Sequence, residues 1–177
     1  MGSPGRRLMG LPPPGWIPPE EFVPTLPHGI AYAALLFRDR AERVLTLRPV
    51  VNPGALDLPG GLLDPGEDLY GCARRETVEE LGFLPACVER REPQLLVLSF
   101  TGPRPPWPWR VGALFDGGVL TDHEIGRITL DPTEHSAYSL TGADEWAAHA
   151  DRRGRRILYA AAAARSTGRT VYLRPLD

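Results

Sequence analysis

One stretch near the middle of the chain, residues 60–83, constrains the fold and the chemistry more than any other. It combines a glycine-rich turn with a helical segment whose glutamates crowd onto one side. The defining residues are Gly61, Glu67, Arg75, Glu76, Glu79, Glu80 and Gly82. A helix turns by about 100° per residue, so Glu76, Glu79 and Glu80 share one arc. The neighbouring side presents Tyr70, Ala73, Thr77 and Leu81, which we expect to pack on a sheet.

The three helix glutamates predict a cation on their side of the helix. Like charges at this spacing destabilise an isolated helix by about 0.2–0.5 kcal/mol per pair, and Arg75 offsets only part of that. Carboxylate oxygens without nearby thiols or imidazoles in the sequence select Mg²⁺ or Mn²⁺ over zinc. Such ions would hold a diphosphate and activate water against it. The stretch therefore indicates metal-assisted hydrolysis of a phosphoanhydride. A solvated helix with Arg–Glu pairs is the alternative, which the number of matching positions disfavours.

This pattern resembles the Nudix box, G-x5-E-x7-R-E-U-x-E-E-x-G-U, where U is a bulky apolar residue. The match runs from Gly61 to Phe83, and Thr77 at the first U position is the only departure. Thr is β-branched and close to Val in size, so the packing should survive. The resemblance implies an α/β (α+β) fold, a mixed β-sheet sandwich flanked by helices. It also implies a pyrophosphohydrolase, a Nudix hydrolase acting on a nucleoside diphosphate linked to another moiety, X.

The resemblance also implies roles for individual residues. The metal ligands would be the Gly60 carbonyl, Glu76, Glu79 and Glu80. The catalytic residues would be Glu67, Arg75, Glu79, Glu80 and Glu134. Among these, Arg75 would orient the glutamates through ion pairs, and Glu67 would assist through a metal or a water. Family members often add a carboxylate from a late loop. Glu134 is our candidate for that role, and Asp116, Asp122 and Glu124 compete with it.

The sequence says less about the substrate. Arg48 and Arg110 lie near strand ends, where they could hold phosphates, and Trp107 in the Pro- and Trp-rich segment 105–109 could stack on a base. A rigid loop is the favoured interpretation of that segment, and a solvated helix start that of the basic run 152–156. No subfamily marker matches. Nucleoside triphosphates or nucleotide sugars are the expected substrates. The alternatives are an isoprenyl diphosphate or a non-catalytic nucleotide-binding role.

The remaining composition predicts a cytoplasmic protein with two parts. A Pro-rich arm spans residues 1–26, and a Nudix domain spans residues 27–177. The net charge of −2 gives no basic field for nucleic acid, and no apolar run is long enough to cross a membrane. The two cysteines fit small buried thiols. Apolar residues in the arm are compatible with its exchange between the subunits of a homodimer.

Hydrophobic patterns predict the elements of the domain. The predicted strands are residues 28–37, 43–48, 88–91, 94–100, 110–115, 125–130, 138–140 and 171–173, the first two paired as a hairpin. Residues 116–118 are predicted to be a turn. After the box, one helix should begin at an N-cap on Thr141, with Asp144 completing a capping box, and end near His149. A second should run from Arg152 to Arg165 and end before Gly168.

Overall fold

The computed structural model describes residues 15–90 and 92–175. Its strands are β1 (Gly29–Arg38), β2 (Val44–Pro49), β3 (Gly60–Leu62), β4 (Leu95–Thr101), β5 (Trp109–Val119), β6 (His135–Thr141) and β7 (Val171–Leu173). Its helices are α1 (Pro19–Phe22), α2 (Leu69–Leu81), α3 (Ala86–Glu89), α4 (Asp122–Ile125), α5 (Ala143–His149) and α6 (Arg152–Thr167), with a 3₁₀ turn, η1, at Val23–Thr25. Mixed strand directions with flanking helices confirm the predicted fold class.

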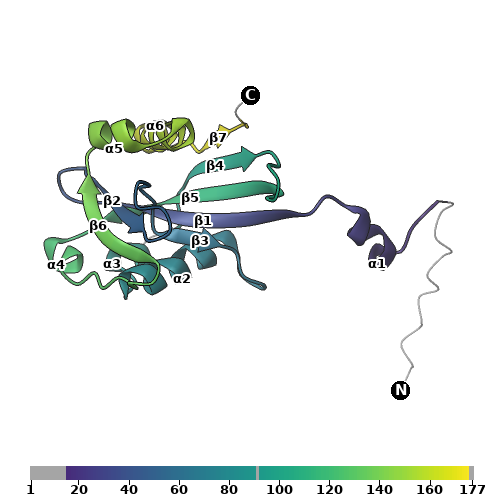
Figure 1. Cartoon of the computed structure of the whole chain (residues 1–177), viewed down its shortest axis with the longest axis horizontal. Helices are drawn as coiled ribbons and strands as arrows, with labels where there is room; N and C mark the ends of the chain where they lie inside the picture. The colour runs from purple at the N-terminus through teal and green to yellow at the C-terminus, as the bar shows by residue number, and fades with distance from the viewer. Residues whose placement is uncertain (1–14, 91, 176–177) are drawn as a thin grey trace, which may run out of the picture.

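The sheet has the strand order β6-β2-β1-β5-β4-β7, with β3 paired to β1 beside that path. Strand β1 lies at the centre: it is parallel to β5 and antiparallel to β2 and β3. Successive apolar side chains of β1 point to opposite faces of the sheet. Leu35 and Phe37 join the core under α2 and α3, whereas Leu36 joins the core under α5 and α6. Helices thus cover both faces of the sheet (Figure 1), which explains why the β1 sequence is apolar almost throughout.

Helix α2 is held at both ends by local sequence signals. The Asp68 side chain accepts a hydrogen bond from the Gly71 N–H, and Gly82 ends the helix in the left-handed conformation with φ 82°. The predicted packing side is confirmed, because Ala73, Thr77 and Leu81 are fully buried. The Thr77 hydroxyl donates to the Ala73 carbonyl, so Thr at this apolar position leaves no buried donor unpaired.

Two predicted strands are wrong. Residues 86–89 form the short helix α3, which follows Pro85 and buries Val88; residue 91 lies outside the described residues. Residues 122–125 form helix α4, and residues 126–134 have no strand. Thr121 and Glu124 start α4 with a reciprocal capping box, a local signal that overrides the apolar pattern of residues 125–130.

A predicted turn and a predicted helix N-cap are also corrected. Residues 116–118 belong to β5, where the pairing with β1 shifts register and the Asp116 side chain accepts from the Gly118 N–H. This is a β-bulge rather than a chain reversal. Thr141 ends strand β6, and Gly142 is the N-cap of α5 without a side-chain cap. The Thr141 hydroxyl is instead 2.7 Å from that of Thr46 in the neighbouring strand.

The other predicted elements are confirmed within a few residues: β1, β2, β4, β5, β6, β7, α5 and α6. Helix α6 ends before Gly168, which has φ 68°. In the described part of the arm, residues 15–26, helix α1 stands away from the sheet (Figure 1). The apolar side chains of this part of the arm, Trp16, Phe22 and Val23, are about half exposed. Residues 15–26 therefore do not pack on their own domain.

Candidate active site

The carboxylate cluster lies between strand β3 and the C-terminal half of helix α2. Glu80 is buried and its Oε2 accepts a hydrogen bond of 2.8 Å from the Gly60 backbone N–H. Burial, together with the nearby negative charges of Glu76 and Glu134, raises the pKa of Glu80 to about 8. In the metal-free protein this carboxyl therefore binds a proton at neutral pH.

Arg75 organises the rest of the cluster. Its guanidinium is 2.8 Å from carboxylate oxygens of Glu67, Glu76 and Glu79, and it also donates to the Leu62 carbonyl. These hydrogen bonds, the one to Glu67 foremost, raise the pKa of Arg75 above its ordinary value. The same contact lowers the pKa of Glu67. The predicted ion pairing of Arg75 with the box glutamates is therefore present in the structure.

Gly61 gives Glu76 its place beside β3. A Cβ on Gly61 would lie 2.2 Å from Glu76 Oε1, so only glycine leaves room for that carboxylate. Gly60 is equally constrained, with φ 157° and a virtual Cβ 2.3 Å from the Ala33 carbonyl. The turn predicted from sequence is thus the short strand β3, and its glycines let helix α2 approach the sheet closely.

Two residues at the start of β6 complete the cluster. Ligand atoms of Glu80, Glu134 and His135 all lie within 4.8 Å of one another, an arrangement that could hold a metal ion. His135 is buried; its Nε2 is 3.6 Å from Glu80 Oε1 and its Nδ1 has no hydrogen-bond partner in the described residues. The sequence reasoning placed no imidazole near the box. It missed His135 because β6 is distant in sequence, although His135 directly follows the singled-out Glu134.

The three carboxylates that competed with Glu134 lie in other surroundings. Asp116 pairs with buried Arg38. Glu124 caps helix α4 and accepts from the Ala86 N–H. Asp122 lies in the first turn of α4. Within the described residues, Glu134 is the one of these four late carboxylates that groups with Glu80 as a potential metal ligand.

The predicted substrate residues lie elsewhere. Arg48 is exposed and donates to the Pro53 carbonyl. Trp107 is 52% exposed on the loop between β4 and β5, and the Arg110 guanidinium carbon is 5.8 Å from its ring centre. None of the three lines the cavity beside the carboxylates. Chain order alone could not show that the β4–β5 loop lies away from α2.

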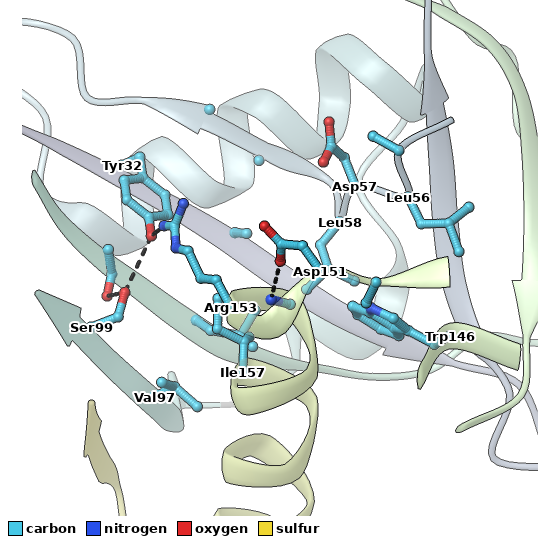
Figure 2. Close-up of a pocket in the computed structure, with 18 of the residues that line it drawn as sticks. Tyr32, Leu56, Asp57, Leu58, Val97, Ser99, Trp146, Asp151, Arg153 and Ile157 are labelled. Carbon is cyan, nitrogen blue, oxygen red and sulfur yellow. Dashed lines mark hydrogen bonds between the residues drawn. The ribbon is translucent and has the colours of Figure 1, made fainter. Parts of the chain in front are cut away.

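A cavity of about 640 Å³ opens beside the carboxylates. At one end it is lined by Gly60, Gly61, Glu80 and His135. The rest of its wall comes from β1, the β2–β3 loop, β4, α5 and α6, and includes Tyr32, Leu58, Val97, Ser99, Trp146, Arg153 and Ile157 (Figure 2). Sequence reasoning missed these residues. Arg153 belongs to the basic run that was interpreted as a solvated helix start, and its side chain points into the cavity instead (Figure 2).

The fold and this carboxylate site define a class of protein, and comparison with known families agrees. The family model described as the NUDIX domain matches residues 27–162. The chain therefore belongs to the Nudix family, which confirms the enzyme class predicted from the sequence, a pyrophosphohydrolase. No curated protein matches the sequence.

Solved structures share the fold. The MutT protein from Methanosarcina mazei Go1 is 23% identical with a TM-score of 0.61, over 77% of this chain and 94% of that one. An Ap4A hydrolase from C. elegans is 20% identical with a TM-score of 0.58, over 78% and 98%. An ADP-ribose pyrophosphatase from Streptococcus suis is 16% identical with a TM-score of 0.52, over 85% and 100%. Within the described residues, no helix is long and apolar enough to span a membrane.

Proposed function

We propose that the protein is a Mg²⁺- or Mn²⁺-dependent hydrolase of a nucleoside diphosphate linked to X. One observation supports this best: a single cavity joins the carboxylate cluster at Glu80 to a wall of mixed apolar and hydrogen-bonding side chains. Its volume of about 640 Å³ lies within the range of small-molecule sites. A diphosphate at the cluster would leave the remaining space for the group that it carries.

The residues of the cluster fit divalent ions. Hard carboxylate oxygens are available from Glu76, Glu79 and Glu80, and buried His135 offers a ring nitrogen within 4.8 Å of carboxylate oxygens of Glu80 and Glu134. When bound, the ions would polarise the phosphoanhydride and acidify a water. We propose that the Gly60 carbonyl with Glu76, Glu79 and Glu80 holds them, as the family resemblance implies, and that Glu134 and His135 contribute a further site.

The protein groups around the ions have separable tasks. The Gly60 N–H fixes one oxygen of Glu80. Arg75 contacts Glu67, Glu76 and Glu79 and so holds their carboxylates in place before any ion binds. The hydrogen bond from Arg75 lowers the pKa of Glu67, so this carboxylate stays ionised and can help through a metal ion or by accepting a hydrogen bond from a water.

The wall of the cavity favours a polar leaving group over an isoprenyl chain. Arg153 and Ser99 line it together with the apolar residues, and burying an unpaired guanidinium against a hydrocarbon chain would be costly. A non-catalytic nucleotide sensor is the second candidate, and the complete glutamate set argues against it because binding alone does not require all four box carboxylates.

A substrate panel tests the proposal. Purified protein is incubated with nucleoside triphosphates, nucleotide sugars, dinucleoside polyphosphates and isoprenyl diphosphates, with Mg²⁺ or Mn²⁺, and released phosphate and pyrophosphate are measured. We expect metal-dependent turnover of at least one nucleotide class. Turnover of isoprenyl diphosphates alone would support the first alternative. Tight binding without turnover of any compound would support the sensor.

A further inference from the structure

The cavity contains one guanidinium, that of Arg153, which forms no direct ion pair with any carboxylate of the described residues. Among the described residues that line it, Arg153 is the only arginine. Its guanidinium hydrogen-bonds to the Tyr32 hydroxyl and lies 5.5 Å from the Tyr32 ring centre. No carboxylate comes within ion-pair distance of it in the described chain, in contrast to Arg38, Arg43, Arg75 and Arg165. Two aspartates also line the cavity. Asp151 caps helix α6 by accepting from the Gly154 N–H. Burial raises the pKa of Asp57 overall, and His135 and Arg153 are close enough for their charges to offset part of that rise.

Tyr32 is held so that Arg153 has a fixed position. The Tyr32 ring covers Gly112 in the parallel neighbour strand, where a Cβ would lie 2.0 Å from the ring. Its hydroxyl is also 3.2 Å from the Ser99 hydroxyl, which donates to the Gly112 carbonyl. Figure 2 shows Arg153 reaching from the start of α6 across the cavity toward Tyr32. The guanidinium is therefore anchored by one contact, while most of its five N–H donors remain free.

Charged side chains of both signs line the cavity: Glu80 belongs to the box, and Arg153 at the start of α6 is accompanied by Asp57 and Asp151. The box end is rich in carboxylates and suits the metal-bound diphosphate, whereas the Arg153 end presents N–H donors beside the apolar side chains of Val97 and Ile157. A flat group with oxygen acceptors along one edge matches this end. Keto nucleobases have such an edge: guanine offers O6 and N7, and uracil and thymine offer O4, whereas adenine and cytosine place an amino donor there.

We propose that Arg153 is a specificity-determining residue that recognises an oxygen-acceptor edge on the nucleoside, so that the enzyme prefers keto nucleobases over amino nucleobases. This inference rests on the proposed function, because it concerns the group carried by the same diphosphate. Two hydrogen bonds from an arginine guanidinium to one base edge favour the matching base over a mismatched one by about 10- to 100-fold in affinity. An acidic sugar in X offers the same acceptor chemistry and is separated in the test.

The test compares kcat/KM for GTP, UTP, ATP and CTP at a fixed Mg²⁺ or Mn²⁺ concentration, and for UDP-glucuronate against UDP-glucose. We expect GTP and UTP to exceed ATP and CTP by at least about 10-fold. Arg153→Met keeps the length of the side chain and removes its donors, so it should abolish that ratio by lowering kcat/KM for GTP and UTP more than for ATP and CTP. The matched control is Arg152→Met, an exposed neighbour that does not line the cavity.

A second readout does not depend on turnover: calorimetric titration with non-hydrolysable GTP and ATP analogues should show the same preference, and Arg153→Met should remove it. Thermal melting confirms that each variant folds. Equal rates on all four nucleotides, or a keto preference that survives Arg153→Met, would overturn the inference. So would selectivity confined to UDP-glucuronate. If no nucleotide is hydrolysed under any condition, the proposed function fails instead, and binding of the analogues still decides the role of Arg153.

Discussion

Gly60 and Glu80 are 20 residues apart in sequence, and a hydrogen bond of 2.8 Å joins the Gly60 N–H to the Glu80 carboxylate. This contact fastens the end of the glutamate helix to the strand that pairs with β1. It fixes Glu80 in a buried position where its negative charge is costly without a cation. The predictions below concern that carboxylate and the groups that hold its neighbours.

Glu80→Gln should lower kcat by at least about 100-fold while the protein stays folded. The amide is the same size, and its NH₂ group cannot ligate a cation. Because Glu80 is desolvated in the metal-free state, the neutral side chain should leave the melting temperature equal or higher. Steady-state kinetics and differential scanning calorimetry measure the two effects. Glu89→Gln, an exposed change on α3, is the control, and near-normal activity of Glu80→Gln would refute the metal assignment.

The metal-free protein should lose stability as the pH rises from about 5 to 8. The pKa of Glu80 is about 8 in the folded protein against an ordinary value of 4.5. The folded state therefore binds more protons than the unfolded state within this window, so raising the pH favours unfolding. Chemical denaturation in EDTA at several pH values measures the slope.

Excess Mg²⁺ should reverse most of this loss at pH 8, because ions bind the deprotonated carboxylates. Glu80→Gln should flatten the slope in EDTA. A wild-type slope of the opposite sign in this window would contradict the assignment of a buried, protonated Glu80.

Arg75→Lys should weaken divalent-ion binding and activity by about 10-fold, in the range typical of groups that orient metal ligands. A single ammonium cannot hold the three glutamates that the guanidinium contacts at 2.8 Å. The cost in stability should stay near or below about 1 kcal/mol, because these pairs are partly exposed. Mg²⁺ titration by calorimetry provides the measurement. Arg74→Lys, on the exposed side of α2, should change neither quantity.

Gly61→Ala should displace the Glu76 carboxylate, since the new methyl group would lie 2.2 Å from Glu76 Oε1. We expect metal affinity and kcat/KM to fall by about 10- to 100-fold. Gly102→Ala has no atom within 4 Å of the added carbon and serves as the control. Unchanged Mg²⁺ affinity in Gly61→Ala would show that Glu76 is not needed in its observed position.

His135→Ala should reduce the affinity for Mn²⁺ more than that for Mg²⁺, because an imidazole nitrogen favours the transition metal. Pulsed electron paramagnetic resonance of the Mn²⁺-loaded protein should show nitrogen coupling that His135→Ala removes. His123→Ala, an exposed change on α4, should retain it. Absence of nitrogen coupling in the wild-type protein would mean that His135 only contacts Glu80.

The sequence was most informative where local spacing decides the structure. The box predicted which side of α2 packs on the sheet and that Arg75 pairs with the glutamates, because both follow from residues three and four positions apart on one helix. A capping box decided α4, and α3 begins directly after Pro85 without a side-chain cap, whereas the apolar patterns of both short segments were misleading. Strand β5 was longer than predicted because a bulge, unlike a turn, lets Asp116 and Gly118 stay in the sheet.

Contacts between distant segments could not be predicted. His135 reaches Glu80 because β6 pairs with β2 at the edge of the sheet, and nothing in the local sequence indicates that pairing. Arg153 enters the cavity because the start of α6 lies over the sheet, so that residues 153–156 of the basic run are half-buried and only Arg152 is exposed. Trp107 was expected to stack on a base and Arg110, near a strand end, to hold a phosphate, but neither the β4–β5 loop with Trp107 nor the start of β5 with Arg110 lines the cavity.

The two ends of the cavity come from different parts of the chain. The carboxylate end is formed chiefly by β3 and α2, whereas Tyr32, Ser99 and Arg153 come from β1, β4 and α6. Mutations that reshape the wall can therefore accumulate without disturbing the groups that hold the diphosphate. Such modularity lets evolution, or an engineer, exchange the preferred leaving group while the hydrolytic chemistry is preserved.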